Sequence, residues 1–114
     1  MPDREPSTTV TEADKGKTVN ICQNDLGRIK LKENPTTGYR WAIDEINEEV
    51  LELEGSVFAM APDAGIGGGG EQTFTFKARK IGTTRVELKL WREWEGEESI
   101  IDRFDVTIQV LDCR

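Results

Sequence analysis

The residues that could do chemistry in this chain gather in three short segments, and the first is a polar turn. Residues Asn34–Tyr39 read Asn-Pro-Thr-Thr-Gly-Tyr and lie between two alternating runs. Pro35 fixes its own φ and pushes Asn34 into an extended conformation, while Gly38 permits a backbone angle that most residues avoid. The pattern predicts a stiff, projecting loop with two hydroxyls at its tip, suited to insertion into another molecule's cleft. The same residue types also make ordinary tight turns.

The second segment, Ala64–Gly70, has five glycines in seven positions. Such a run disfavours regular structure and suits a backbone that closely approaches another surface. A phosphate-binding loop would need a helix to follow it, and usually a lysine. Here Glu71 and a strand-like run follow instead, and the glutamate would repel phosphate. The segment therefore indicates either a main-chain contact loop or a plain linker.

The third segment, Trp91–Gly96, reads Trp-Arg-Glu-Trp-Glu-Gly. The alternation of residues 86–90 places Trp91 on the wetter face of its strand and Trp94 beyond the strand end. Tryptophan and arginine are enriched among the residues that dominate protein interfaces. The segment thus predicts a binding loop; the alternative is that Trp91 folds back onto the sheet and Trp94 covers the rim of the sandwich.

The chain has no histidine, which excludes the usual base of Ser-His-Asp and Cys-His mechanisms and the common imidazole metal sites. Its two cysteines, Cys22 and Cys113, lack further soft ligands nearby and do not make a zinc site. They form a disulfide if the first and last strands are neighbours. Otherwise Cys22 is a free buried thiol and Cys113 lies in a frayed terminus. We expect no cofactor and no metal.

Composition indicates one soluble domain. The 114 residues are 36% hydrophobic and 32% charged, and a chain of this length can bury a real core. The formal charge of −7 disfavours nucleic acid and anionic membranes as partners, and there is no apolar run able to span a bilayer. Residues 1–6 lack the apolar stretch of a secretory signal, so the default expectation is a cytoplasmic protein unless a leader has been removed. We expect a monomer.

Alternation with period two predicts an all-β fold. Apolar residues alternate with polar ones in about eight short runs separated by turn residues, which is typical of antiparallel sheets with one wet face. The runs cover residues 19–21, 29–31, 39–43, 51–53, 57–60, 74–78, 86–90 and 104–110. This pattern predicts an immunoglobulin-like β-sandwich over residues 15–114, preceded by a flexible arm over residues 1–14. A single helical turn near Asp44–Glu49 is the one helical candidate.

Taken together, the three segments resemble the loops of the chagasin-like inhibitors of papain-family cysteine peptidases. That family carries an Asn-Pro-Thr-Thr-Gly-aromatic loop, matched by Asn34–Tyr39. It carries a glycine-rich loop that leads into a strand with alternating aromatics, similar to Gly67–Gly70 followed by Phe74 and Phe76. It also carries an Arg-Pro-Trp loop that ends in glycine, similar to Arg92–Gly96. The likeness covers about residues 18 to 110 in order and spacing.

The resemblance implies a non-enzymatic protein that reversibly inhibits papain-like peptidases. In that family the first loop covers the catalytic cysteine and histidine, and the other two loops grip the walls of the cleft. Carried over to this chain, the peptidase-binding residues are Asn34, Pro35, Thr36, Thr37, Gly38, Tyr39, Gly67, Gly68, Gly69, Gly70, Arg92 and Trp94. Glu93 departs from the family's usual proline, so the third loop is expected to be less rigid and more acidic.

Three other readings compete with inhibition. A carbohydrate-binding sandwich would use Trp91 and Trp94 as a flat aromatic row. A glycosidase would use two of the carboxylates at Glu93, Glu95, Glu97 and Glu98, although the run looks like a solvated loop. The third is a plain adhesion or structural domain.

Overall fold

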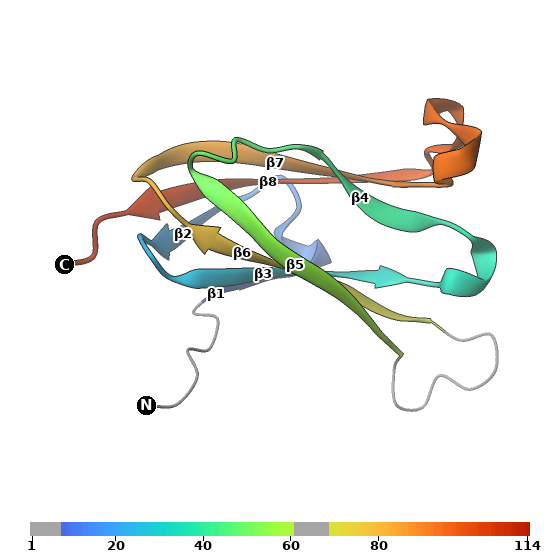
Figure 1. Ribbon diagram of the computed structural model, residues 1–114, viewed down its shortest axis with the longest axis horizontal. Helices are drawn as coiled ribbons and strands as arrows, with labels where there is room; N and C mark the ends of the chain where they lie inside the picture. The colour runs from blue at the N-terminus through green and yellow to red at the C-terminus, as the bar shows by residue number, and fades with distance from the viewer. Residues whose placement is uncertain (1–7, 61–68) are drawn as a thin grey trace.

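The computed structural model describes residues 8–60 and 69–114, and within them the chain forms eight strands in two four-stranded sheets. The strands are β1 (Thr8–Val10), β2 (Thr18–Cys22), β3 (Leu26–Glu33), β4 (Arg40–Glu45), β5 (Leu51–Met60), β6 (Gly70–Ala78), β7 (Gly82–Trp91) and β8 (Asp102–Leu111). Four short 3-10 turns accompany them: η1 (Glu12–Asp14), η2 (Pro35–Thr37), η3 (Glu93–Glu95) and η4 (Glu97–Ser99). The two sheets pack face to face as the layers of a sandwich (Figure 1).

The first sheet has the strand order β1-β3-β6-β5 and the second has β2-β8-β7-β4. All pairings are antiparallel except β1 with β3 and β2 with β8, which are parallel. The predicted immunoglobulin-like sandwich is therefore confirmed. None of the helical turns in the described part of the chain is long and apolar enough to span a membrane.

The core is the set of inward side chains that the period-two alternation identifies. On β7, Val86 and Leu88 are fully buried, and on β8 so is Val106. On β6, Phe74 and Phe76 fill the space opposite them. Burying side chains of this size stabilises the fold by roughly 1.5–3 kcal/mol each. Alternation predicts this core because a one-residue slip would turn a whole strand's apolar set toward water.

Three details differ from the prediction. Residues 8–14, predicted as part of an arm, form β1 and η1, because Val10 is buried in the core and Thr11 caps η1. The two runs over residues 51–53 and 57–60 are one strand, β5, interrupted by a register shift between Leu53 and Gly55. Asp44 does not begin a helical turn but lies within β4; the turn comes later, where the Asn47 side chain accepts from the Glu49 N–H.

The topology brings the first and third candidate loops, and the ends of β5 and β6 that the glycine-rich connection joins, to one end of the sandwich (Figure 1). Residues 34–39 connect β3 of the first sheet to β4 of the second. The glycine-rich connection joins β5 to β6 within the first sheet, and residues 92–101 join β7 to β8 within the second. We call these the first, second and third loops. Because the first loop crosses between the sheets, it lies between the third loop and the ends of β5 and β6.

A disulfide joins Cys22 to Cys113 at the opposite end of the molecule from the loops. It forms because β2 and β8 are neighbours, with Cys22 opposite Leu111 in the register. Of the two alternatives left open by the sequence, the structure has the disulfide. It closes a loop with a sequence separation of 91 residues.

The first prediction concerns this crosslink. Replacing both cysteines by serine should lower the free energy of unfolding by roughly 2–5 kcal/mol, since the crosslink restricts the unfolded chain. Denaturant unfolding of the variant and of the wild type, with and without reductant, measures the difference. Wild-type protein that shows two titratable thiols when unfolded without reductant would contradict the pairing.

Candidate functional site

The first loop is held in one conformation by its own side chains. Asn34 caps η2, with Oδ1 accepting from the Thr36 N–H at 3.1 Å and from the Thr36 hydroxyl at 2.6 Å. The Thr37 hydroxyl donates to the Asn34 carbonyl at 2.8 Å and accepts from the Tyr39 N–H at 3.3 Å. Gly38 closes the turn with φ of 81°, a conformation that glycine adopts without strain. The predicted stiff, projecting turn is thus a 3-10 turn with Thr36 and Thr37 exposed at its tip.

These contacts limit what the hydroxyls can offer a partner. Each donates its proton within the loop, so toward another molecule the Thr36 oxygen is an acceptor. The Thr37 oxygen already accepts from the Tyr39 N–H, so its hydrogen bonds are made within the loop. The chemistry of the tip is therefore that of a hydrogen-bonded, pre-shaped surface, not of a nucleophile.

Arg92 of the third loop binds the first loop directly. Its Nε and Nη2 atoms donate to the Thr37 carbonyl at 3.2 and 3.0 Å. Its guanidinium carbon lies 4.3 Å from the centre of the Tyr39 ring, and its Nη1 lies 3.4 Å from Glu95 Oε2. The planar guanidinium is suited to forked hydrogen bonding and aromatic stacking at the same time. Two loops far apart in sequence are joined by this one side chain.

Trp94 lies on the same junction and remains largely in solvent. Its side chain is 71% exposed, yet a Cβ placed on Gly38 would come within 3.0 Å of Trp94 Cη2. The indole therefore rests its edge on the glycine of the first loop and presents most of its surface outward. A large apolar side chain in this position is typical of a binding surface.

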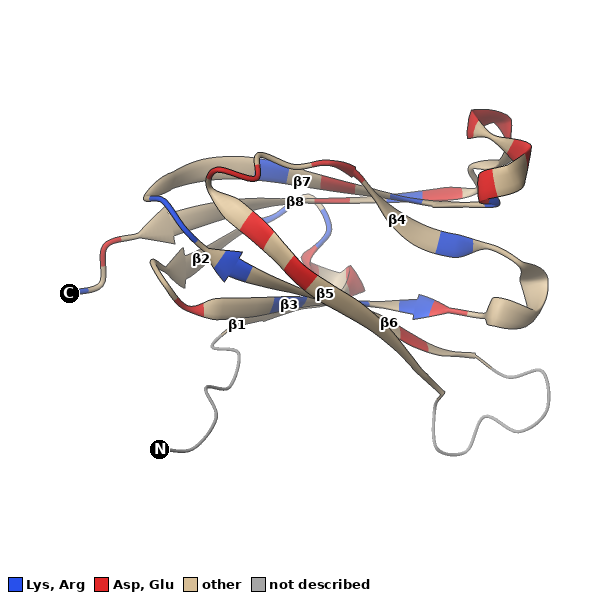
Figure 2. Ribbon diagram, viewed as in Figure 1, with Lys and Arg blue, Asp and Glu red and all other residues tan. Residues whose placement is uncertain are grey.

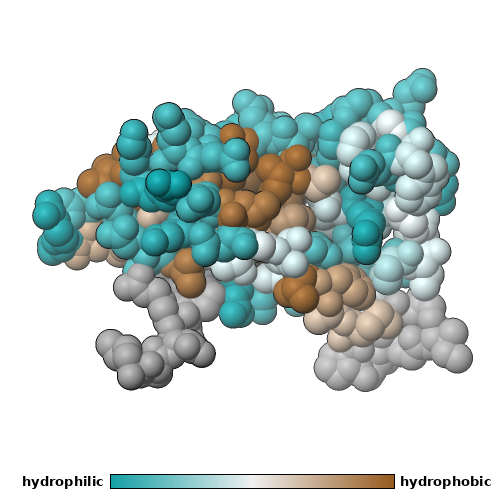
Figure 3. Space-filling view, in the orientation of Figure 1, coloured by the Kyte–Doolittle hydropathy of each residue, from teal (hydrophilic) through white to brown (hydrophobic). Residues whose placement is uncertain are grey.

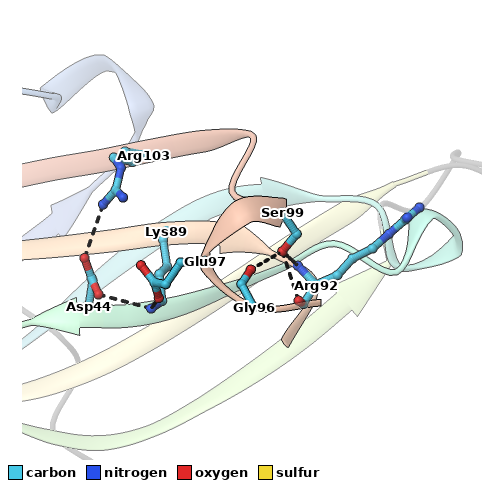
Figure 4. A network of polar contacts seen from close by, with 7 residues as sticks. All are labelled: Asp44, Lys89, Arg92, Gly96, Glu97, Ser99 and Arg103. Atoms are coloured by element: carbon cyan, nitrogen blue, oxygen red, sulfur yellow. Dashed lines mark hydrogen bonds and ion pairs between the residues drawn. The ribbon is translucent and has the colours of Figure 1, made fainter. Parts of the chain in front are cut away.

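The third loop has an internal hydrogen-bond network centred on Ser99 (Figure 4). Ser99 Oγ accepts from the Arg92 N–H at 3.0 Å and lies 2.6 Å from the Gly96 carbonyl and 3.0 Å from the Arg92 carbonyl. Turns η3 and η4 follow one another, joined by Gly96 with φ of 78°. The serine ties the two limbs of the loop together.

The second loop is described only at its edges. Gly67 and Gly68 lie outside the described residues, so the structure does not place these two predicted contact residues. Gly69 lies against the base of the first loop, where an added Cβ would be 3.2 Å from the Glu33 carbonyl. Gly70 is buried in β6, where an added Cβ would overlap the Ala59 carbonyl. Gly70 is thus required for close strand packing, and its contact with a partner stays a prediction.

The base of the first loop contains a buried carboxylate. Glu33 is 4% exposed, and its Oε1 accepts from the Trp41 N–H at 2.7 Å. The Trp41 indole donates to the Lys32 carbonyl at 2.8 Å. These two bonds connect the last residues of β3 with the first of β4 and fix the loop at its root. Glu33 Oε2 has no hydrogen-bond partner among the described residues.

The third loop is the most acidic part of this end, whereas the first loop carries no charged side chain (Figure 2). Glu93 and Glu98 are exposed, while Glu95 and Glu97 are paired with Arg92 and Lys89. On the opposite side of the first loop the surface is apolar, since Val57 and Met60 are exposed along the loop end of β5 (Figure 3). The described residues contain no cluster of three or more His, Cys, Asp or Glu that could hold a metal ion.

The geometry also tests the competing readings. Trp91 is partly buried beneath the Lys89 ammonium, 3.7 Å from its ring centre, so the two tryptophans do not form a flat exposed row. The glutamates assigned to a glycosidase include two that are held in ion pairs. Both observations weaken the alternatives to a loop-based binding surface.

Sequence reasoning found the residues at the tip and missed those that hold them. Ser99, Glu33 and Lys89 carry no motif, because a serine, a glutamate or a lysine among many others gives no signal before the fold is known. The alternation of β7 does place Lys89 on the outer face, but it does not indicate that Asp44 and Glu97 converge on it. The contact of Arg92 with the first loop was likewise unpredicted.

Comparison with known proteins identifies the family. A profile of the family described as "Chagasin family peptidase inhibitor I42" matches residues 20–108. Chagasin from Trypanosoma cruzi is 32% identical over 109 residues, which cover 90% of this chain and 97% of chagasin. Amoebiasin-2 from Entamoeba histolytica is 32% identical over 93 residues, covering 80% and 76% of the two chains.

Solved structures show the same fold. The crystal structure of the cysteine protease inhibitor EhICP2 from Entamoeba histolytica matches with a TM-score of 0.79 and 27% identity, over 94% of this chain and 100% of that one. The structure of PbICP-C in complex with falcipain-2 matches with a TM-score of 0.66, 15% identity and coverage of 97% and 96%. The protein is thus a peptidase inhibitor and not an enzyme. It belongs to the chagasin family.

The second prediction separates the strain at Gly38 from its contact with Trp94. Gly38→Ala and Gly16→Ala should each cost roughly 1–2 kcal/mol of stability, since both glycines have φ near 80°. Nothing lies within 4 Å of a Cβ at Gly16, so only Gly38→Ala should move the Trp94 indole. Urea unfolding and the indole N–H chemical shifts of the three tryptophans report the two effects. An unchanged Trp94 signal in Gly38→Ala would contradict the packing described here.

Proposed function

We propose that this protein is a reversible inhibitor of papain-like cysteine peptidases and that its three loops fill the active-site cleft. The observation that carries the proposal is the junction of Arg92, Trp94 and the first loop at one end of the sandwich. The names of its relatives support the target class, since EhICP2 is a cysteine protease inhibitor and PbICP-C was solved with falcipain-2.

Each loop has a separate role in this proposal. Pro35, Thr36, Thr37 and Gly38 enter the cleft above the catalytic cysteine and histidine, while Asn34 and Tyr39 hold that loop in shape. Residues Gly67–Gly70 run along one wall by main-chain contacts, and the close packing of Gly70 in β6 anchors the end of that run. Arg92 and Trp94 lie on the other wall. A footprint of this kind approaches the roughly 800 Å² per partner of a standard interface.

The first loop can occupy a peptide-cleaving cleft because it is itself a poor substrate. A productive substrate lies extended, with its carbonyl in line for attack. Here η2 curls the chain, and Asn34 and Gly38 close it at both ends, which holds the peptide groups away from that geometry. Since the loop is already ordered, little conformational entropy is lost on binding.

The third prediction tests the target class. Titration of active papain with this protein should abolish hydrolysis of a short peptide substrate with a stoichiometry of about one to one, since the three loops of one molecule fill one cleft. A serine peptidase such as trypsin, assayed with its own short substrate, is the control and should keep its activity. Full papain activity in the presence of several equivalents of folded protein would refute the proposal.

The fourth prediction concerns Trp94. Trp94→Ala should weaken inhibition of papain by more than tenfold, because a largely exposed indole at an interface centre typically contributes roughly 2 kcal/mol or more. Ile81→Ala is the matched control: Ile81 is 55% exposed but lies in the β6–β7 turn at the other end. Inhibition constants for the two variants make the comparison. Equal constants would show that the third loop does not contact the enzyme.

A further inference from the structure

An ion-pair cluster lies on the outer face of the second sheet, behind the third loop (Figure 4). Lys89 of β7 pairs with Asp44 Oδ1 of β4 at 3.2 Å and with Glu97 Oε2 of η4 at 2.5 Å. Asp44 Oδ2 also binds Arg103 Nη1 of β8 at 3.2 Å. We call these four residues the Lys89 cluster. It joins four segments, β4, β7, β8 and η4; β4 follows the first loop, and η4 is part of the third.

Lys89 is unusual among the cations of this surface because it is covered. Its side chain is 10% exposed, whereas that of Arg85, four residues earlier on the same face of β7, is 61% exposed. Its ammonium also lies over the Trp91 ring. The hydrogen bond to Glu97 raises the pKa of Lys89 above its ordinary value, against the opposing effect of burial, and Asp44 adds to the rise. The group is therefore charged at any pH near neutrality.

The cluster gives the third loop a second attachment. At its tip the loop is fixed to the first loop by Arg92, which binds the Thr37 carbonyl. The ends of the loop are held by β7 and β8, but the Arg92 contact does not attach its η4 limb to the face of the sheet. Lys89 lies three residues before Arg92 on an extended strand, roughly 10 Å away. Holding Glu97 at that distance attaches the η4 limb to the sheet and so restrains the turn that carries Trp94.

Residue 93 does not itself restrict the loop backbone. A proline at that position would restrict the backbone by fixing φ, and glutamate does not. The restraint on the loop in this chain comes instead from side chains: Ser99 within the loop and Glu97 to the sheet. Since β4 follows the first loop directly, the Asp44 contact also ties this restraint to the loop that enters the cleft.

We propose that Lys89 is a positioning residue for inhibition: by binding Glu97 and Asp44, it holds the third loop in the orientation that fits a peptidase cleft. This inference rests on the proposed function. Lys89 itself does not contact the peptidase. It acts by keeping the competent loop conformation populated, and a smaller competent fraction reduces apparent affinity by that fraction. The association rate constant falls when binding has to wait for the correct conformation.

Lys89→Met is the test variant. Methionine keeps the apolar stem over Trp91, Asp44 retains Arg103, and the released Glu97 is already 65% exposed, so no buried charge is left unpaired. The variant should fold and associate with papain roughly fivefold more slowly than the wild type, with little change in the dissociation rate constant. Arg85→Met is the matched control. It removes pairs with Glu87 and Asp105, both at 3.5 Å, from the same strand face but away from the loop, and should leave both rate constants unchanged.

A double-mutant cycle shows whether Lys89 acts through Glu97. Glu97→Ala should slow association as Lys89→Met does, and the double variant should be no slower than either single one. Relaxation of the indole N–H groups gives a readout that needs no peptidase: Trp94 should become more mobile in Lys89→Met, while Trp41, bonded to the Lys32 carbonyl, should not.

The outcomes separate the two hypotheses. Wild-type protein that does not inhibit papain would refute the proposed function, and the indole measurement would still test the positioning role. Wild-type inhibition with unchanged association and unchanged Trp94 mobility in Lys89→Met would overturn the inference. The inference would also be overturned if Lys89→Met slowed association by the same factor in the wild-type and Glu97→Ala backgrounds. Lys89 would then act independently of Glu97.

Discussion

The fork of hydrogen bonds from Arg92 to the Thr37 carbonyl is the interaction on which the shape of the binding end depends. A main-chain carbonyl at the tip of a tight turn would otherwise be left to solvent. The guanidinium binds it, stacks on Tyr39 and brings Trp94 against Gly38. One side chain thereby joins two separate connections into a single rigid edge, and rigidity lowers the conformational cost of association.

The sandwich topology decides which loop stands in the middle. Only a connection that passes from one sheet to the other can occupy the centre of the end, and among the three candidate loops this is the β3–β4 connection. The buried pair of Glu33 and Trp41 secures that crossing at its root. An acidic surface flanks it on one side and an apolar one on the other, so the three parts of the edge differ in chemistry as well as in position.

Much of this could be predicted because strand alternation and turn chemistry are local signals. Period two identified the sandwich and its core, and the Asn-Pro-Thr-Thr-Gly run identified a stiff turn before any coordinates. What local signals did not give are contacts between distant segments: the Arg92 fork, the pairing of β1 with β3, and the convergence of Asp44 and Glu97 on Lys89. The cysteine pairing depended in the same way on which strands are neighbours. Gly70 shows a further difficulty of prediction. In the sequence, a glycine required for strand packing looks the same as one required for contact with a partner.

The placement of the carboxyl terminus has a practical consequence. Arg114 follows the cysteine that is bonded to β2, at the pole remote from the three loops (Figure 1). A solid support, a dye or a second folded unit attached after that residue would therefore extend away from the three loops. A molecule immobilised through its carboxyl terminus would therefore leave its binding loops accessible to a peptidase in solution.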